Sequence, residues 1–173
     1  ILLGVNLTNQ HHDMVLILTF QIIIMFSFLL FNFPKAKMFL GDAGSYLCGS
    51  LIAINAIKTH QLNPQTSSFF FASILFYLSY EVFFSFIRKT VKKKSPLNPD
   101  NLHLHMLLYN FLLKSKKFTN SNYKTSITIN LAYLTSLIPT ILFQENGSIS
   151  RYYFFLLLIL YTSSYYFLLK LMK

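Results

Sequence analysis

The segment "GDAGS" at residues 41–45 contains residue types that could bind a phosphate and a metal ion. Two glycines, Gly41 and Gly44, lie on either side of Asp42, and glycine lets a backbone approach a ligand closely. Ser45 could cap a helix that follows, and the positive end of that helix would favour phosphate. A carboxylate beside phosphate suggests Mg²⁺, which prefers these oxygens. A simple capping turn, in which Asp42 accepts backbone N–H groups, would explain the same residues.

A second segment, "SPLNPDNLHLH", ends at His105 and contains a pair of histidines. Its two prolines favour an extended backbone, and we expect Asp100 or Asn101 to cap a helix beginning at Leu102. On a helix, His103 and His105 would diverge by about 200°, whereas on a turning segment they could face one way. Beside phosphates, the pair could donate hydrogen bonds or carry protons. Two neutral surface histidines would need no such role.

The elements that must position these residues are strongly apolar. Of the 173 residues, 54% are hydrophobic and 12% are charged, while a soluble domain carries about twice that charged share. Four charge-poor runs, which contain only the charge of Glu81, are long enough for helices that cross a bilayer. We therefore predict an all-α polytopic membrane protein rather than a soluble bundle. Its single membrane domain, 1–173, would have about five transmembrane helices, at 14–33, 45–58, 67–87, 125–143 and 152–169.

The basic residues predict how these helices are oriented. The net charge is +10, and with the spans above thirteen of the fifteen Lys and Arg residues fall on one side. The other side has only Lys58 and Arg151. Positive residues mark the cytoplasmic side, so the long loop 88–124 is predicted to be cytoplasmic. Its first basic residues, 88–94, would lie against anionic headgroups. This explains the positive charge without a nucleic-acid partner.

Three of the five acidic residues lie at or near the predicted cytoplasmic side: Asp42, Glu81 and Asp100. A carboxylate on a membrane element is energetically costly, so function is the default hypothesis. Glu81 has two interpretations. It could pair with Arg88 or Lys89, one to two helical turns further on, or it could support the same site as a weaker ligand.

In their order along the chain, these segments resemble the polyprenyl-phosphate N-acetylhexosamine-1-phosphate transferases, which form glycosyltransferase family 4. This family includes the enzyme that forms the first lipid intermediate of peptidoglycan, and undecaprenyl-phosphate N-acetylglucosamine-1-phosphate transferase. The matching residues are "NFPKAKMFLGDAGS" at 32–45, Glu81 with Arg88-Lys89, and "SPLNPDNLHLH" at 95–105. The resemblance covers roughly residues 1 to 110. We expect the chain to be a C-terminal fragment of a larger transferase.

The resemblance implies transfer of a sugar-1-phosphate from a UDP-sugar to undecaprenyl phosphate, with release of UMP. It also implies a requirement for Mg²⁺, or alternatively Mn²⁺. Asp42 would be the metal ligand, or an essential acid beside it. Asn32 and Phe39 would hold the nucleotide, with Phe39 stacking on uracil. His103 and His105 would contact the phosphates.

Further site residues follow from the same resemblance. Gly41, Gly44, Ser45 and Asp100 are expected to bind substrate, and Glu81 and Arg88 are expected to have secondary roles. The resemblance further implies a multi-pass protein of the bacterial inner membrane, with its site facing the cytoplasm. It is also compatible with a homodimer.

The chain departs from the family pattern at three positions. Met106 replaces the last histidine of the usual motif, Asn101 often is Arg, and Glu81 replaces an aspartate. The paired aspartates of the family lie upstream of the region matched here, so we expect the 173 residues alone to be inactive. The competing hypothesis is a non-enzymatic subunit for membrane transport or assembly. A prenyl-transferring enzyme is a weaker alternative, because this chain lacks the two Asp-rich motifs of that class.

Overall fold

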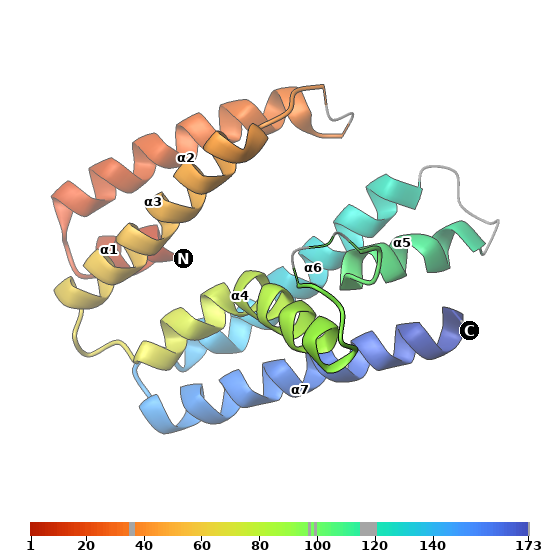
Figure 1. Cartoon of the computed structure of the whole chain (residues 1–173). Coiled ribbons are helices and arrows are strands. Elements are labelled where there is room, and N and C mark those ends of the chain that lie inside the picture. The colour runs from red at the N-terminus through yellow and green to blue at the C-terminus, as the bar shows by residue number, and fades with distance from the viewer. Residues whose placement is uncertain (35–36, 97, 99, 115–120, 173) are drawn as a thin grey trace. The chain divides into compact units, whose positions relative to one another are not determined.

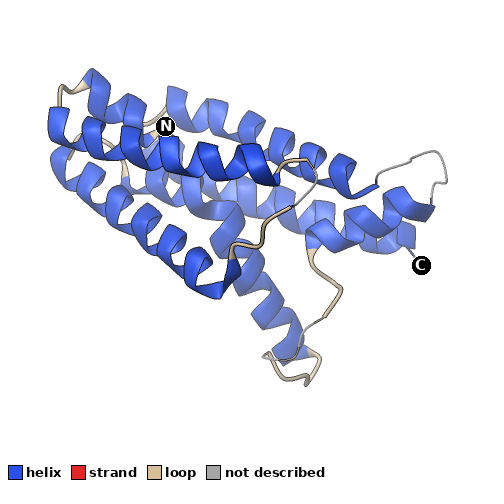
Figure 2. Ribbon diagram, turned by 90° about the horizontal axis from the view of Figure 1, so that it is seen from above, coloured by secondary structure: helices blue, strands red, loops and turns tan. Residues whose placement is uncertain are grey.

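The computed structural model describes residues 1–34, 37–96, 98, 100–114 and 121–172 (Figure 1). All regular secondary structure in these residues is helical, which confirms the predicted all-α fold (Figure 2). The chain forms two compact units, residues 1–66 and 67–173. That they act as one membrane domain stays a prediction.

The first unit consists of α1 (Leu2–Thr8), α2 (His12–Asn32) and α3 (Gly41–Leu62), and α1 packs against both longer helices. Hydrogen bonds between polar side chains join α1 and the residue after it to the end of α3. Asn6 Nδ2 donates to Thr59 Oγ1 at 2.9 Å, and Asn9 Nδ2 donates to Asn63 Oδ1 at 2.6 Å. Further along, Asn55 Nδ2 of α3 donates to Gln21 Oε1 of α2. These partners satisfy polar groups that would be costly to bury alone.

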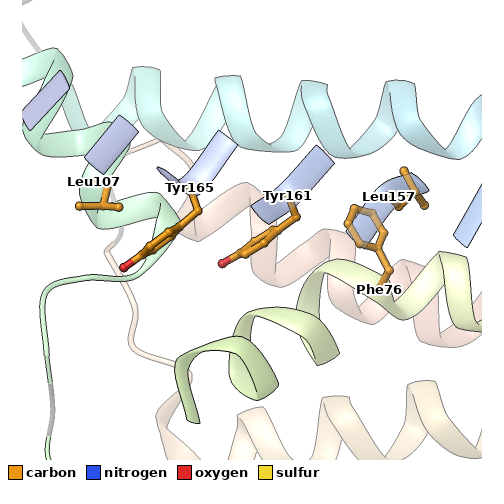
Figure 3. Close-up of a cluster of buried hydrophobic side chains, with 5 residues drawn as sticks. All are labelled: Phe76, Leu107, Leu157, Tyr161 and Tyr165. Atoms are coloured by element: carbon orange, nitrogen blue, oxygen red, sulfur yellow. The ribbon is translucent and has the colours of Figure 1, made fainter. Parts of the chain in front are cut away.

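The second unit consists of α4 (Ser68–Val91), α5 (Leu104–Lys114), α6 (Ser121–Leu142) and α7 (Gly147–Met172). Helix α4 packs along α7, and α5 packs against α6 and α7 (Figure 1). The buried core joins α4, α5 and α7 through five side chains, which Figure 3 shows: Phe76, Leu107, Leu157, Tyr161 and Tyr165. Helix α5 lies inside the predicted loop 88–124, so this loop is partly structured and contributes to the core.

Four of the described helices are long and apolar enough to cross a membrane: α2, α4, α6 and α7. Helix α2 shows most clearly why. Its buried residues are Met14 and Leu18, whereas large side chains such as Ile24 and Leu30 are 69% and 65% exposed. A helix that is apolar all round and exposed suits a lipid environment. The chain is therefore a multi-pass membrane protein.

Helix α3 is the fifth predicted span, and it differs from the other four. Its 22 residues would extend about 33 Å, which is long enough to cross a bilayer. It is more polar, however, and is not among the four helices that qualify by length and composition. It begins at Gly41, four residues before the predicted start, so the glycine-rich segment belongs to its first turns.

Candidate functional site

The first unit contains an open cavity of about 470 Å³ at the start of α3. It is formed by the segment that connects α2 to α3 and by the first turns of α3. The structure here brings together five of the residues that the sequence singles out. The lining residues are Asn32, Lys37, Met38, Phe39, Leu40, Gly41, Asp42 and Ser45.

Two local features shape this cavity. Asn32, the last residue of α2, accepts a hydrogen bond from the Met38 backbone N–H at 3.2 Å, which joins the two ends of the connecting segment. Gly41 has a φ of +69°, a conformation that residues with a side chain rarely adopt. The Phe39 side chain is 96% exposed and is not used in the core. Its ring is thus available to a ligand.

Asp42 lies in the first turn of α3, where the helix favours negative charge. The prediction that Ser45 caps this helix is wrong. Ser45 Oγ donates to the Gly41 carbonyl oxygen at 2.5 Å from within the helix, and the residue at the cap, Leu40, makes no side-chain hydrogen bond. Among the described residues, the exposed Asp42 carboxylate has no hydrogen-bond or ion-pair partner. The capping-turn interpretation of Asp42 is therefore not supported.

In the second unit, the Glu81 carboxylate on α4 is the acceptor for three donors. Its Oε1 lies 2.8 Å from His103 Nδ1 and accepts the Leu104 backbone N–H at 3.2 Å. Its Oε2 accepts a hydrogen bond from the hydroxyl of Tyr161 on α7. Glu81 thus contacts the histidine segment and the last helix, and not Arg88 or Lys89 as one interpretation of the sequence proposed.

Arg88 and Lys89, at the end of α4, hold the segment that follows. The Arg88 guanidinium and the Asp100 carboxylate form a two-point ion pair, with N–O distances of 3.0 and 3.2 Å. Lys89 Nζ donates to the carbonyl oxygens of Pro96 and Asn98 at 3.1 and 2.7 Å. Both basic side chains are largely buried. They are therefore internal partners of the loop, although the sequence placed them among residues facing headgroups.

The environment of Asp100 favours its charged form. Partial burial acts to raise the pKa of this carboxyl, but other effects outweigh it. Hydrogen bonds from Arg88 and from the Leu102 backbone N–H, together with the charges of Arg88 and Lys89, place the pKa below its usual value. Asp100 consequently remains an anionic anchor for the two cations.

The two histidines face the same way. Their rings stack with centroids 5.6 Å apart and an interplanar angle of 18°. This is feasible because α5 begins at Leu104, so His103 lies before the helix; the predicted start at Leu102 is two residues too early. The backbone N–H group that Asp100 accepts is that of Leu102, in a local turn before the helix. His103 Nε2 lies 3.8 Å from Asp100 Oδ1, so the histidine and ion-pair groups are contiguous.

The predicted site residues thus form two groups. The first unit holds Asn32, Phe39, Gly41, Asp42 and Ser45 around its cavity, with Gly44 nearby in α3 but outside the lining. The second unit holds Glu81, Arg88, Asp100, His103 and His105 in one cluster of contacts.

Tyr161 is a partner of the cluster that the sequence motifs do not indicate. The run 152–169 is predicted only as a membrane span, yet Tyr161 and Tyr165 within it are four residues apart and therefore share a helix face. Hydroxyl groups on one face of a membrane helix are a usable signal, because each needs a partner away from water.

The described residues contain no group of three or more His, Cys, Asp or Glu side chains arranged to hold a metal ion. Asp42 is nevertheless a suitable single ligand, being exposed and without an internal partner. Mg²⁺ is commonly bound by one or two carboxylates together with substrate phosphates. The donor set fits a metal shared with a phosphate ligand.

Comparison with known proteins relates part of the chain to one family of enzymes. Residues 1–60 match the family described as glycosyl transferase family 4. The chain is similar to an undecaprenyl-phosphate alpha-N-acetylglucosaminyl 1-phosphate transferase of Thermotoga maritima, with 38% identity over 88 residues, 51% of this chain and 28% of that one. The Haemophilus influenzae protein of the same name is 37% identical over 89 residues, 49% and 24% of the two chains.

A third relative is the decaprenyl-phosphate N-acetylglucosaminephosphotransferase of Mycolicibacterium smegmatis. It is 32% identical over 92 residues, which are 45% of this chain and 22% of that one. The matched segments thus span about a quarter of the length of these curated relatives. No solved structure matches the chain.

Proposed function

We propose that this chain, whose residues 1–60 match glycosyl transferase family 4, takes part in transferring a sugar-1-phosphate from a UDP-sugar to undecaprenyl phosphate. The sugar would be an N-acetylhexosamine, as the names of the relatives suggest, and the reaction would serve cell-envelope polysaccharide synthesis. The observation that carries the proposal is the cavity of the first unit, where an exposed aromatic ring and an unpartnered carboxylate line one space.

The cavity supports binding of a nucleotide. The fully exposed ring of Phe39 offers a stacking surface for uracil, and base–aromatic stacking tolerates such an open position. The side chain of Asn32 fixes the segment that carries this ring, through its bond to Met38. The open volume of about 470 Å³ is within the usual range for a small-molecule site.

Asp42 would hold Mg²⁺, or Mn²⁺ in its place. When bound, the metal would neutralise phosphate charge, which is the main requirement of phosphoryl transfer. Asp42 fits this role because its carboxylate is exposed and lies in a helix turn that favours anionic ligands.

The histidines of the second unit would act on phosphate groups. Because Glu81 accepts a hydrogen bond from Nδ1 of His103, Nε2 of His103 is the ring nitrogen left for a ligand. The stacked ring of His105 adds a second candidate contact. In the reaction, a phosphate oxygen of the lipid attacks the phosphorus that bears the sugar. The bond from that phosphorus to the bridging oxygen then breaks, and UMP leaves.

The proposed location is the bacterial inner membrane, and the charge distribution supports a site that faces the cytoplasm. A nucleotide sugar would reach the site from the cytoplasm, while the lipid phosphate would lie at the membrane surface. A homodimer is part of the proposal, and crosslinking in membranes tests it.

The central experiment measures UMP release in membranes that contain the protein expressed from its complete gene. UDP-N-acetylglucosamine and undecaprenyl phosphate are supplied, with and without Mg²⁺. We expect release to depend on both substrates and on the metal, and Asp42→Asn to lower it at least a hundredfold, because the metal ligand is lost.

Asp13→Asn is the matched control, because Asp13 also lies in the first turn of a helix, α2. The cavity lies at the other end of α2, next to Asn32. It should retain activity within about twofold, as distant surface changes usually do. Full activity of Asp42→Asn would exclude the metal role. Absence of any UMP release from the unaltered protein would favour the competing hypothesis of a transport or assembly subunit.

A further inference from the structure

The last helix contributes to the histidine cluster, and we propose that Tyr161 is a positioning residue for the reaction. Through the Glu81 carboxylate, its hydroxyl fixes the ring orientation and the protonated nitrogen of His103. The effect of Tyr161 on catalysis rests on the proposed function, but its effect on His103 can be tested without any enzymatic activity. It assigns a role to α7, a helix outside the residues that match the family.

The Tyr161 ring is held firmly. Its side chain is only 5% exposed, and it projects from α7 in the same direction as Tyr165 (Figure 3). It makes edge-to-face contacts with Tyr80 and Phe84 of α4, with ring centroids 5.1 and 5.6 Å away. Such contacts restrict ring rotation. The hydroxyl is therefore presented to Glu81 at a defined position.

Glu81 transmits this position to the histidine. Its side chain is 13% exposed, and both of its oxygens are occupied: Oε2 by Tyr161 and Oε1 by His103 and the Leu104 backbone N–H. A carboxylate bound at both ends cannot rotate freely. It accepts from the ring, so Nδ1 of His103 carries a proton and Nε2 is the nitrogen left for a ligand. Partners of this kind commonly fix the tautomer and orientation of functional histidines.

A merely structural role for Tyr161 would be to join α4 and α7. The chain offers two matched controls for that role. Tyr80 OH and Thr162 Oγ1 form another hydrogen bond between the same two helices, at 2.9 Å. Tyr165 is equally buried one turn along α7, and its hydroxyl has no hydrogen-bond partner among the described residues. Neither contacts Glu81 through its hydroxyl.

The first measurement compares the enzyme kinetics of Tyr161→Phe, Tyr80→Phe and Tyr165→Phe in membranes expressing the complete gene. Each substitution removes one hydroxyl and keeps the ring. We expect Tyr161→Phe to lower kcat about tenfold with little change in KM for the UDP-sugar, an effect typical of lost orienting partners. The controls should stay within about twofold of the unaltered protein. Equal losses in Tyr161→Phe and Tyr80→Phe would overturn the positioning role.

The second measurement needs no activity. Protein labelled with ¹⁵N-histidine is purified in micelles, and the His103 signals are assigned by their loss in His103→Gln. We expect Nδ1-protonated His103 in the unaltered protein and in both controls, and a mixture of the two tautomers in Tyr161→Phe. An unchanged tautomer in Tyr161→Phe would overturn the proposal. If the tautomer shifts as expected but no UMP is released by the unaltered protein, then the proposed function fails and the positioning stands.

Discussion

At the scale of single residues, the acids Asp42 and Glu81 have opposite surroundings. Asp42 is exposed and has no partner among the described residues, whereas Glu81 is largely buried and accepts three hydrogen bonds. An unpartnered carboxylate can bind a ligand at no cost in internal contacts. A fully bonded carboxylate is better suited to hold other groups in place. These surroundings are the basis for proposing a binding role for Asp42 and a positioning role for Glu81.

Phe39 provides a prediction at this scale. If its ring stacks on uracil, Phe39→Ala should raise KM for the UDP-sugar about tenfold or more, in line with the contribution of base–aromatic stacking. The value of kcat should change little, since the ring is remote from the bond that breaks. Thermal unfolding should also be unchanged, because a side chain that is 96% exposed makes few internal contacts. Steady-state kinetics and a melting curve in detergent measure these effects.

Tyr46→Ala is the control for Phe39→Ala. Tyr46, on α3, is also a highly exposed aromatic residue, and it does not line the cavity. It should leave KM unchanged, while Phe39→Trp should keep KM near the original value because the stacking surface remains. If Phe39→Ala and Tyr46→Ala have the same KM, the stacking role of Phe39 is excluded.

At the scale of elements, the segment between α4 and α5 is held from the end of α4. Arg88 pairs with Asp100, and Lys89 bonds two carbonyl oxygens of the same segment. Since Glu81 lies on the same helix, α4 supplies three side chains that fix the histidine region. The fixed positions of the two histidine side chains therefore depend on contacts with α4 more than on the start of α5.

Lys89→Met tests this dependence while keeping the aliphatic part of the side chain. The segment 95–103 would lose two charge-assisted hydrogen bonds, each worth about 1.5–3 kcal/mol. We expect amide hydrogen exchange in this segment to accelerate at least tenfold, while exchange in the middle of α4 stays unchanged. Mass spectrometry of labelled peptides measures this effect.

Lys92→Met serves as the control, because Lys92 is exposed at the cap of α4. It should not alter exchange in segment 95–103. Equal protection in Lys89→Met and in the unaltered protein would show that Arg88 and Asp100 alone hold the segment.

The elements also show how far the sequence predicts the structure. Long apolar runs correctly predicted α2, α4, α6 and α7, because burial or lipid contact leaves such runs few alternatives to helix. Helix boundaries were less accurate: α3 includes the glycines of its first turn, and α5 begins after His103 rather than before it. Before α5, Asp100 accepts the Leu102 backbone N–H in a local turn and also pairs with Arg88, a contact that sequence spacing does not reveal.

The residues of the candidate site could be named from the sequence, but the contacts between them could not. The types of Asp42, Glu81 and His103 made them candidates, since carboxylates and histidines are rare in this apolar chain. The bond from Tyr161 to Glu81 joins residues eighty positions apart, so it depends on how α4 packs along α7. Propensity and periodicity contain no information on that pairing.

At the scale of the whole molecule, the basic residues on the predicted cytoplasmic side include two that are buried and paired within the protein. Thirteen basic residues fall on the predicted cytoplasmic side, but Arg88 and Lys89 are buried partners of the loop. Eleven remain against two on the other side, so the predicted orientation does not depend on the buried pair. In the predicted orientation, α2 and α4 both begin on the side opposite the cytoplasm. Because α2 ends at the cytoplasmic side, α3 must cross the membrane to bring the chain back to the start of α4.

The polarity of α3 is compatible with crossing. Its polar residues find internal partners: Asn55 bonds Gln21 of α2, and Thr59 accepts from Asn6 of α1. Hydrogen bonds between helices make polar side chains tolerable within a membrane. The 22 residues of α3 can also extend across the hydrocarbon layer. We therefore predict that α3 spans the membrane, with Lys37 on the cytoplasmic side and Gln65 on the other.

Single-cysteine labelling decides this prediction. Cys48 is the only cysteine of the chain, so Cys48→Ser provides a background for Lys37→Cys and Gln65→Cys, two exposed positions beyond the ends of α3. In spheroplasts, a membrane-impermeant maleimide should label Gln65→Cys directly and Lys37→Cys only after permeabilisation. Ser148→Cys and Lys94→Cys are the reference positions for the two sides, because they lie at ends of the well-supported spans α7 and α4. Labelling of Lys37→Cys and Gln65→Cys from one side would mean that α3 enters and leaves the same face of the membrane, which would contradict the prediction.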